Sequence, residues 1–230
     1  MQSFSFEKAV GAVIDEYAAL AERSYGHPVR DLTDLREVAD IRVALRSGSV
    51  VAGGLGLLVP QFFGGSPVLS ACLGAGAVAP EERGDRLASR LAGERVQALQ
   101  DQGAVISSMW TASTGYARFL GWEAPVGTLA WSVPAEALKR SFGADGSDHE
   151  IRFGLTEAGR ELQRLMARRW NGPVDRPSWW IDWKRRKANL MYYEFVDQGE
   201  TVGLLGCVCA STKFTAWSSL SKISGADLVK

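Results

Sequence analysis

The residues of this chain best suited to chemistry form a turn that follows a long apolar segment. Residues 68–79 are small and apolar, and Pro80 ends that run. A short polar turn, residues 81–85, comes next, and apolar side chains then recur at helical spacing from Leu87 to Leu99. A helix that begins here leaves its first backbone N–H groups unpaired and directs the positive end of its dipole into the turn. The pattern therefore predicts a buried strand, a turn that suits a phosphate, and a helix.

The same residues resemble the pyrophosphate-binding signature of the GNAT acetyltransferases, V-x-P-x-x-R/Q-x-x-G-x-G/A. Residues 78–88, VAPEERGDRLA, align with that signature without a gap. One position differs, because Arg86 stands where the family has its central glycine. A glycine would let the backbone come close to the pyrophosphate, whereas an arginine must turn its side chain away or meet the phosphates with charge.

This resemblance implies that the chain binds acetyl-CoA as a co-substrate. The end of the apolar strand would pair with acetyl-CoA through its backbone, and the turn would hold the pyrophosphate. The expected cofactor-binding residues are Gly76, Val78, Arg83, Gly84, Asp85, Arg86, Leu87, Ala88 and, at a later helix, Ser113.

A second stretch carries the candidate general acid, Tyr116. Residues 112–123, ASTGYARFLGWE, resemble a second GNAT signature, A-T-x-x-F-Y-x-x-L-G-[FWY]-E. In the gapless alignment the family's proton-donating tyrosine falls on Ala117, and Tyr116 replaces the preceding phenylalanine. Tyr116 is the donor if the helix starts one residue later, or if a one-residue gap lies near Gly115; otherwise it is a structural tyrosine under the central helix. Neighbouring helical positions point about 100° apart, so the two alternatives place the phenol differently.

The elements that must position these residues fit an α/β GNAT fold, with a mixed, mostly antiparallel sheet and flanking helices. Within the hairpin, residues 57–68 resemble the Eis-type (enhanced intracellular survival) N-acetyltransferases. The expected elements are a helix over 7–25, a short acidic helix near 32–40, strands over 41–45 and 50–59, a turn over 61–67, the central strand and helix, a strand over 103–110, a helix over 112–120 and a strand over 128–133.

The C-terminal part starts the same pattern again. The expected domains are a GNAT acetyl-CoA-binding domain over 1–134, a linker over 135–155 and an incomplete second GNAT-like domain over 156–230. In this last region the phrase RPSWW resembles the second acetyltransferase-like domain of Eis-type proteins, which binds no acetyl-CoA of its own. The elements expected there are a helix over 156–170, strands over 190–196 and 202–210, and a helix over 214–224. The second strand would leave an unpaired sheet edge, which predicts a homo-oligomer or a partner chain at that edge.

Composition narrows the classes of partner. The 26 basic residues balance 26 acidic ones, so the chain as a whole has no electrostatic attraction to nucleic acid or to an anionic membrane. The longest apolar runs, 50–60 and 68–80, fall short of the roughly 20 residues that a spanning helix needs. Residues 1–7 lack the basic start and apolar block of a signal peptide, so a cytoplasmic location is expected. His149 has no other histidine or cysteine at ligand spacing, and no metal site is expected.

Three functions are consistent with these patterns. The resemblance implies an N-acetyltransferase that moves acetyl from acetyl-CoA to a primary amine, such as an aminoglycoside-like compound or another polyamine. The departures at Arg86 and Ala117 favour a catalytically impaired homologue that binds CoA weakly or serves as a structural or regulatory partner. Residues 160–187 hold nine basic and three acidic side chains with tryptophans between them. This pattern is typical either of a surface that binds nucleic acid or an anionic membrane, or of a helix whose tryptophans pack inward while its arginines are solvated.

Overall fold

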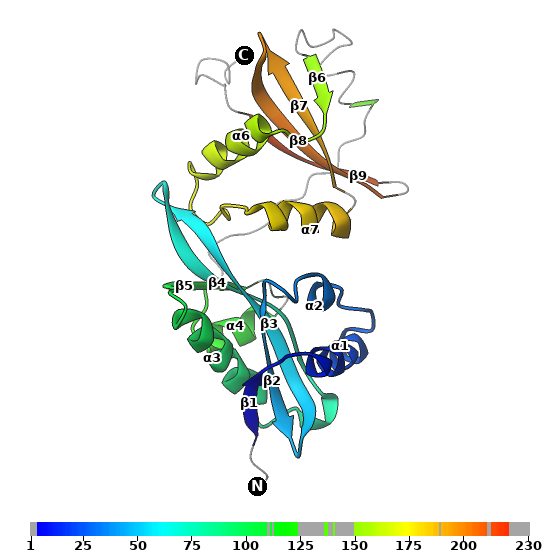
Figure 1. Ribbon diagram of the computed structural model, residues 1–230, viewed down its shortest axis with the longest axis vertical. Helices are drawn as coiled ribbons and strands as arrows, with labels where there is room; N and C mark the ends of the chain where they lie inside the picture. The colour runs from blue at the N-terminus through cyan, green and yellow to red at the C-terminus, as the bar shows by residue number, and fades with distance from the viewer. Residues whose placement is uncertain are drawn as a thin grey trace. The chain divides into compact units, whose positions relative to one another are not determined.

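The computed structural model describes two compact units of the chain (Figure 1). The first contains Met1–Glu123 with Asn171–Arg176, and the second contains Ala124–Trp170 with Pro177–Lys230. The expected strand over 128–133, His149 and most of the expected linker lie outside the described residues. The described residues are 4–109, 111, 113–123, 136–137, 140, 150–188, 190–210 and 213–220.

The first unit is built on a five-stranded sheet in the order β1-β2-β3-β4-β5. Strands β1 to β4 pair antiparallel, and β5 pairs parallel with β4. This sheet is the mixed, mostly antiparallel one that the sequence predicts. Its strands are β1 (Ser5–Lys8), β2 (Asp40–Arg46), β3 (Ser49–Phe63), β4 (Ser66–Val78) and β5 (Ile106–Met109).

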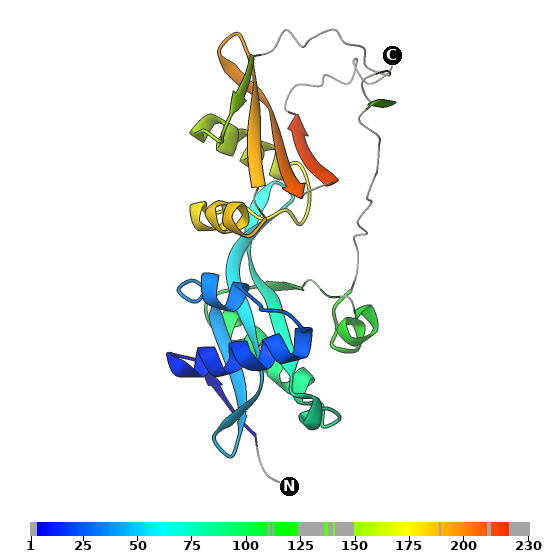
Figure 2. The same ribbon diagram turned by 90° about the vertical axis from the view of Figure 1, so that its right-hand side faces the viewer.

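Helices cover both faces of this sheet (Figure 2). A Cβ at Gly53 of β3 would meet Tyr17 of α1, and a Cβ at Gly56 would meet Leu99 of α3. Since these two β3 residues point to opposite faces, α1 and α3 lie on opposite sides of the sheet. No helix within the described ranges is long and apolar enough to cross a membrane. The first unit's helices are α1 (Ala12–Tyr25), α2 (Asp31–Asp34), α3 (Leu87–Gln100), α4 (Thr114–Phe119) and the 3₁₀ turn η1 (Pro80–Glu82).

Two expected boundaries near the start of the chain are wrong. The helix expected over 7–25 begins only at Ala12, because Gly11 takes a positive φ of 55° and the preceding residues form β1. Pairing with β2 and packing of Phe6 against the core outweigh the helical pattern there. The turn expected over 61–67 is also too long. Strand β3 continues to Phe63, and Gly64 and Gly65 make a tight hairpin turn with positive φ.

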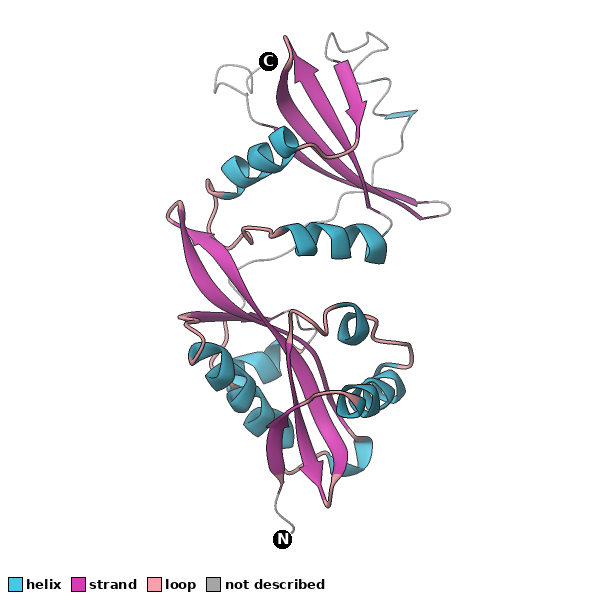
Figure 3. Cartoon of the chain, in the orientation of Figure 1, coloured by secondary structure: helices cyan, strands magenta, loops and turns pink. Residues whose placement is uncertain are grey.

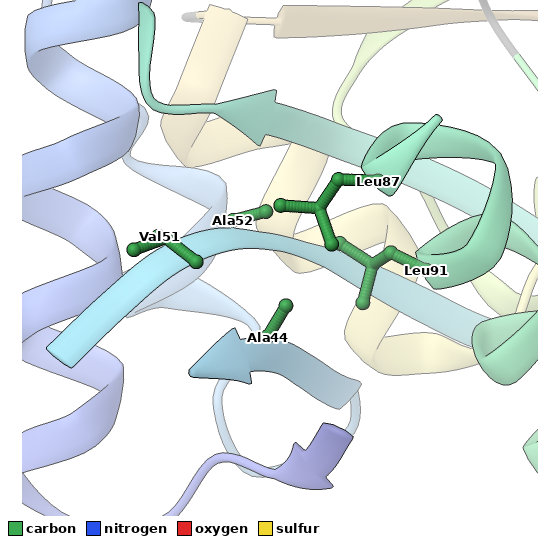
Figure 4. Packing of buried hydrophobic residues seen from close by; sticks show 5 residues of the cluster. All are labelled: Ala44, Val51, Ala52, Leu87 and Leu91. Atoms are coloured by element: carbon green, nitrogen blue, oxygen red, sulfur yellow. The ribbon is translucent and has the colours of Figure 1, made fainter. Parts of the chain in front are cut away.

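The first turn of α3 is anchored by packing onto the sheet (Figure 4). Leu87 and Leu91 are 2% and 3% exposed, and both point from α3 toward β2 and β3. There they contact Ala44, Val51 and Ala52. Burying two leucine side chains stabilises the unit by about 3–6 kcal/mol, which fixes the helix start and with it the turn before it.

A segment from later in the chain completes the outer part of β3. Residues 171–176 belong to the first unit and run beside the β3–β4 hairpin. The Phe62 N–H donates to the Pro173 carbonyl at 2.9 Å, and the Gly172 N–H donates to the Phe62 carbonyl at 2.7 Å. The Gln61 amide donates to the Gly172 carbonyl at 2.7 Å. The hairpin of β3 and β4 therefore forms backbone hydrogen bonds with a segment that lies far from it in the sequence.

The second unit has a four-stranded antiparallel sheet in the order β6-β7-β8-β9, with α6 and α7 packed on it (Figure 3). Leu162, Ile181, Tyr192 and Leu204 form its core. The strands expected over 190–196 and 202–210 are confirmed as β7 and β8. The elements are β6 (Glu150–Phe153), α6 (Glu157–Ala167), α7 (Ser178–Ala188), β7 (Leu190–Asp197), β8 (Glu200–Ala210) and β9 (Lys213–Leu220).

The helix expected over 214–224 is wrong. Residues 213–220 form β9, which pairs with β8 from Gly203 to Ala210. Phenylalanine, threonine and tryptophan in this segment favour a strand, and the available edge of β8 gives that strand its partner. The edge of β8 that was expected to be unpaired is therefore paired with β9 of the same chain. This edge no longer supports the expectation of a homo-oligomer or a partner chain.

Candidate functional site

The site is organised around a bulge in β4. In the β3–β4 ladder, Gly54 faces two residues, Ala75 and Gly76, instead of one. Ala75 takes a positive φ of 48°, a conformation that costs a residue with a side chain roughly 1–2 kcal/mol. The pairing of β4 with β5 ends at Leu73, just before the bulge. Strand β5 ends at Met109, so within the described residues β4 has no paired strand on that side beyond Leu73.

Tyr17 holds the bulge from the α1 face. A side chain at Gly53 would overlap the Tyr17 ring, so the glycine makes room for it. The ring is fully buried, and its hydroxyl donates a hydrogen bond to the Ala75 carbonyl. Burial raises the pKa of Tyr17 above its ordinary value, which keeps the phenol neutral. Tyr17 is thus a positioning residue for the bulge.

Arg95 holds the bulge from the α3 face. A side chain at Gly54 would overlap the Arg95 guanidinium, so this glycine too is required by close approach. Arg95 Nη2 donates to the Gly74 carbonyl at 2.8 Å and to the Leu55 carbonyl. Burial lowers the pKa of the Arg95 guanidinium below its ordinary value, because the charged form is desolvated. The Arg95 guanidinium thus binds two facing backbone carbonyls, one from β3 and one from β4.

We expect Gly54→Ala to lower the free energy of unfolding by about 2–4 kcal/mol, since the new methyl group must displace the guanidinium and free two buried carbonyls. Urea unfolding would measure the loss. Gly93→Ala is the matched control, because Gly93 lies inside α3 with no atom within 4 Å of an added Cβ. That substitution should stabilise the chain by about 0.5–1 kcal/mol. Equal effects of the two substitutions would contradict the role given to Gly54.

A cavity of about 550 Å³ opens beside the bulge and the turn that follows β4. Seven of the nine expected cofactor-binding residues line it, together with Tyr116. A smaller cavity of about 190 Å³ shares part of this lining and reaches Arg95, Met109 and Thr111. The seven residues are Gly76, Val78, Arg83, Gly84, Arg86, Leu87 and Ala88.

Two expected cofactor contacts, Asp85 and Ser113, do not line either cavity. The Asp85 side chain is 70% exposed and lies 3.8 Å from Arg46. Ser113 precedes α4, and its N–H donates to the Thr111 hydroxyl at 3.0 Å. The signature places both residues near the ligand by spacing alone, whereas the turn directs Asp85 toward β2.

The turn itself is held by ion pairs with α1 and β2. Arg46 lies 2.8 Å from the Glu82 carboxylate, whose side chain is only 12% exposed. Arg23 of α1 lies 3.3 Å from Glu81, an exposed pair that contributes little by itself. Arg83 faces the cavity, and its Nε donates to the Val78 carbonyl at 3.4 Å. The two glutamates are thus neutralised by arginines outside the cavity, which leaves Arg83 available to a ligand.

Arg86 adopts the backbone conformation that the family's glycine would supply. It precedes α3 with φ 55° and ψ 20°, in the left-handed region. Its guanidinium carbon lies 6.0 Å from the centroid of the exposed Phe119 ring. The side chain therefore extends along the cavity rim toward α4, and the backbone geometry of the turn does not require glycine.

We expect the Arg86 backbone to tolerate glycine but not a branched residue. In Arg86→Gly, relief of left-handed strain is offset by greater freedom of the unfolded chain, so the free energy of unfolding should change by less than about 1 kcal/mol. Arg86→Val should cost about 1–2 kcal/mol, because β-branched side chains are strained at positive φ. Chemical unfolding compares the two. A more stable valine variant would show that the left-handed conformation is wrong.

Tyr116, and not Ala117, reaches the cavities. Tyr116 of α4 is half-buried and lines both of them, whereas Ala117 is 7% exposed and packs into the interior. Burial raises the pKa of Tyr116, while a hydrogen bond with Ser89 and the charge of Arg95 act in the opposite direction. The phenol is therefore protonated at neutral pH, as an unperturbed tyrosine also is, and a proton donor requires this form.

Sequence reasoning missed Tyr25. This residue ends α1, lines both cavities and donates its hydroxyl hydrogen to the Gly76 carbonyl at 2.8 Å. The carbonyl expected to pair with acetyl-CoA therefore already has one partner. Burial raises the pKa of Tyr25 as well, so it is a second neutral phenol at the site. Its sequence position, at the end of a helix and 51 residues from Gly76, gives no indication of this contact.

The charged and polar lining of the cavities suits an anionic ligand with an apolar part. Arginine side chains from the turn and from α3 supply positive charge, and two phenols supply donors. Within the described ranges, no group of three histidine, cysteine, aspartate or glutamate side chains could hold a metal ion. The arrangement can bind phosphate groups at the turn and donate a proton from Tyr116.

Solved structures resemble the chain over nearly its whole length. A GCN5-related N-acetyltransferase from Anabaena variabilis has 21% sequence identity and a TM-score of 0.79, with 96% of this chain and 59% of that one covered. A GCN5-related N-acetyltransferase from Kribbella flavida has 19% identity and a TM-score of 0.75, with 96% and 58% covered. The chain thus shares their fold and spans a little under three fifths of their length.

The sequence comparison gives the family. No curated protein sequence matches the chain. A family model described as an acetyltransferase (GNAT) domain matches residues 7–124, which include strands β2 to β5, the turn after β4 and Tyr116. That match covers just over half of the chain. The chain belongs to the acetyltransferase (GNAT) domain family.

Proposed function

We propose that this chain is an acetyl-CoA-dependent N-acetyltransferase that transfers an acetyl group to a primary amine. The observation that carries the proposal is that Arg83 and Tyr116 line one cavity. Arg83 belongs to the turn that matches the family's pyrophosphate signature, and Tyr116 is a protonated phenol within the same space. A binding group for phosphates and a proton donor are the two parts that acetyl transfer from acetyl-CoA needs.

The residues at the turn fit acetyl-CoA. The left-handed backbone at Arg86 and the open space around Gly84 let a pyrophosphate approach the main chain closely. The first N–H groups of the 14-residue helix α3 lack intrahelical partners and point toward the turn. Arg83 adds a charge-assisted hydrogen bond to a phosphate oxygen. A cavity of about 550 Å³ falls within the usual range for small-molecule sites.

The proposed reaction makes limited demands on the protein. Acetyl-CoA supplies an acetyl group activated as a thioester. As the amine nitrogen forms a bond to the acetyl carbon, the C–S bond breaks and its electron pair remains on sulfur. Tyr116 gives its proton to that sulfur and is reprotonated by solvent, while the nitrogen loses its extra proton to solvent. The bulge at Ala75 and the ion pair between Arg46 and Glu82 hold β4 and the turn after it in fixed positions. Holding the reactants in a fixed geometry supplies much of the rate acceleration.

The proposed acceptor amine is an aminoglycoside-like compound or another polyamine, because the β3–β4 hairpin sequence resembles the Eis-type enzymes. A catalytically impaired homologue is the alternative, and it is supported by Ala117 at the family's donor position. The location of Tyr116 at the cavity supports the active enzyme, since a phenol one residue earlier reaches the same space.

Two measurements on the purified chain test the proposal. Calorimetry with acetyl-CoA should show binding, and a thiol-release assay should show turnover with a panel of polyamines and aminoglycosides but not with a tertiary amine, which cannot form a stable amide. Binding without thiol release for any amine would favour the impaired homologue. Absence of both would overturn the proposal.

A further inference from the structure

Arg95 is a buried positive charge with no counterion in the described part of the first unit. The residue is 7% exposed, and an arginine stays protonated in proteins. Across the described residues, no carboxylate forms an ion pair with it. Its buried Nε has no hydrogen-bond partner. Removing an unpaired ion from water costs several kcal/mol. Hydrogen bonds to two carbonyls are therefore a weak reason to bury an arginine at this position.

The groups around Arg95 do not neutralise it. Tyr17 and Tyr25 approach from α1, Tyr116 from α4 and Asp40 from β2. The three phenols are uncharged at neutral pH, which is well below the ordinary tyrosine pKa of about 10, and burial raises the pKa of each further. The Asp40 carboxylate is already paired, with Arg42 at 2.9 Å and with Lys8 at 3.8 Å. Arg95 therefore keeps a net positive field at its position.

That field is directed into the smaller cavity. Arg95, Gly74 and Tyr116 all line it. Arg95 Nη1 lies 3.4 Å from the position that a Cβ on Gly76 would take, so the guanidinium lies against the face of β4 at a residue that has no side chain. A ligand here would meet a positive charge that is itself buried, and charge interactions are stronger at a buried site than in water.

The position of this cavity along β4 indicates which part of a ligand it receives. From Val78 to Gly74 the strand rises about 13 Å. The proposed function places phosphates at the turn after Val78, so a ligand that follows the open edge of β4 brings its far end to Gly74 and Arg95. For acetyl-CoA that end is the thioester. This step rests on the proposed function.

We propose that Arg95 is an electrostatic residue of the transfer site, which stabilises the negative charge that develops on the thioester oxygen and sulfur while the C–N bond forms and the C–S bond breaks. The electron pair of the C–S bond remains on sulfur near the guanidinium until Tyr116 delivers its proton. Arg95 gives up no proton in this step. Its hydrogen bonds to Gly74 and Leu55 hold the charge in place.

The ionisation of the thiol in bound CoA tests this proposal without any turnover. Free CoA and CoA bound to the wild-type chain are titrated by the ultraviolet absorbance of the thiolate. The bound S-methyl thioether of CoA, which has no ionisable thiol, gives the baseline that removes the tyrosine signal. We expect the pKa of the bound thiol to lie about 1–2 units below that of free CoA, since a cation within about 4–6 Å favours the thiolate.

Two substitutions separate charge from shape. Arg95→Met keeps an unbranched side chain without charge, and Arg95→Lys keeps the charge without the planar fork. The bound thiol in Arg95→Met should return to within about 0.3 unit of the pKa in free CoA, and kcat should fall by about 10- to 100-fold. Arg95→Lys should retain at least half of the wild-type shift. Circular dichroism would show whether each variant is folded.

The outcomes are distinct. A wild-type chain that binds CoA with an unshifted thiol pKa overturns the role of Arg95 and leaves the proposed acetyltransferase standing; this result needs no variant. An equal shift in wild type and folded Arg95→Met assigns the effect to another group and also overturns it. If the wild type binds no CoA, the proposed function and this inference fall together. A shift lost in Arg95→Met and kept in Arg95→Lys supports the inference.

Discussion

Replacing Tyr116 by phenylalanine should lower kcat for acetyl transfer by about 10²–10⁴-fold, the usual contribution of a positioned general acid. The hydroxyl is the only group removed, and the ring still fills its half-buried place in both cavities. Affinity for acetyl-CoA should therefore stay within about twofold of wild type. Steady-state thiol release and calorimetry on the same preparations measure the two quantities.

Tyr25→Phe is the matched control for this substitution. It removes a second phenolic hydroxyl from the same cavities, but one that already donates to the Gly76 carbonyl. We expect a loss of kcat below about tenfold. A large loss in Tyr25→Phe with little effect in Tyr116→Phe would show that the proton comes from α1.

The pH dependence of kcat gives an independent measure of the same proton. Burial raises the pKa of Tyr116 above the ordinary value of about 10. A group that acts as an acid must be protonated, so kcat should stay level as the pH rises to about 10 and fall only above it. Tyr116→Phe should lack this fall. A decline in kcat near neutral pH, present in both proteins, would point to a different donor.

The strand, turn and helix around Pro80 could be predicted because their determinants lie within about twenty consecutive residues. Small apolar residues, Pro80 and the spacing of Leu87 and Leu91 each favour one element of strand, turn and helix. The structure builds those elements as β4, η1 and α3. The outward direction of Asp85 could not be predicted, because it depends on Arg46 of β2, which is remote in sequence.

The contacts that hold the bulge in β4 could not be predicted from the sequence, because they join residues that are far apart along the chain. The hydroxyl of Tyr17 reaches a carbonyl 58 residues later, and Arg95 reaches one 40 residues earlier. A usable indication was nevertheless present. Two adjacent glycines inside a strand, Gly53 and Gly54, weaken the strand unless another group approaches the backbone closely. Here one glycine admits the tyrosine and the other admits the arginine.

The register of the helix that carries Tyr116 shows where motif alignment stops. Sequence alone places Ala117 at the donor position and leaves Tyr116 with two possible roles. Packing favours Tyr116, because α4 buries Ala117 and leaves the phenol at the cavity. An alignment counts positions along the chain, whereas the direction of a side chain depends on which face of the helix is buried.

Arg83→Ala should weaken CoA binding by about 10- to 100-fold, because a charge-assisted hydrogen bond to phosphate contributes about 1.5–3 kcal/mol. The loss should be the same for CoA and acetyl-CoA, since the contact is with the pyrophosphate and not with the acyl group. Arg83→Lys should fall between alanine and wild type, because it keeps the charge and loses the planar fork. Calorimetry at fixed ionic strength gives the dissociation constants.

Arg90→Ala is the control for the charge itself. Arg90 lies one helical turn into α3, with its guanidinium carbon 5.0 Å from the Phe6 ring centroid, and it does not line the cavity. Removing it changes the net charge as much as Arg83→Ala does, so a nonspecific electrostatic effect would weaken CoA binding equally in both variants. We expect Arg90→Ala to stay within about twofold of wild type, because exposed charges beyond the contact shell are screened by salt. Equal losses in the two variants, or none in Arg83→Ala, would mean that the phosphates do not bind at this turn.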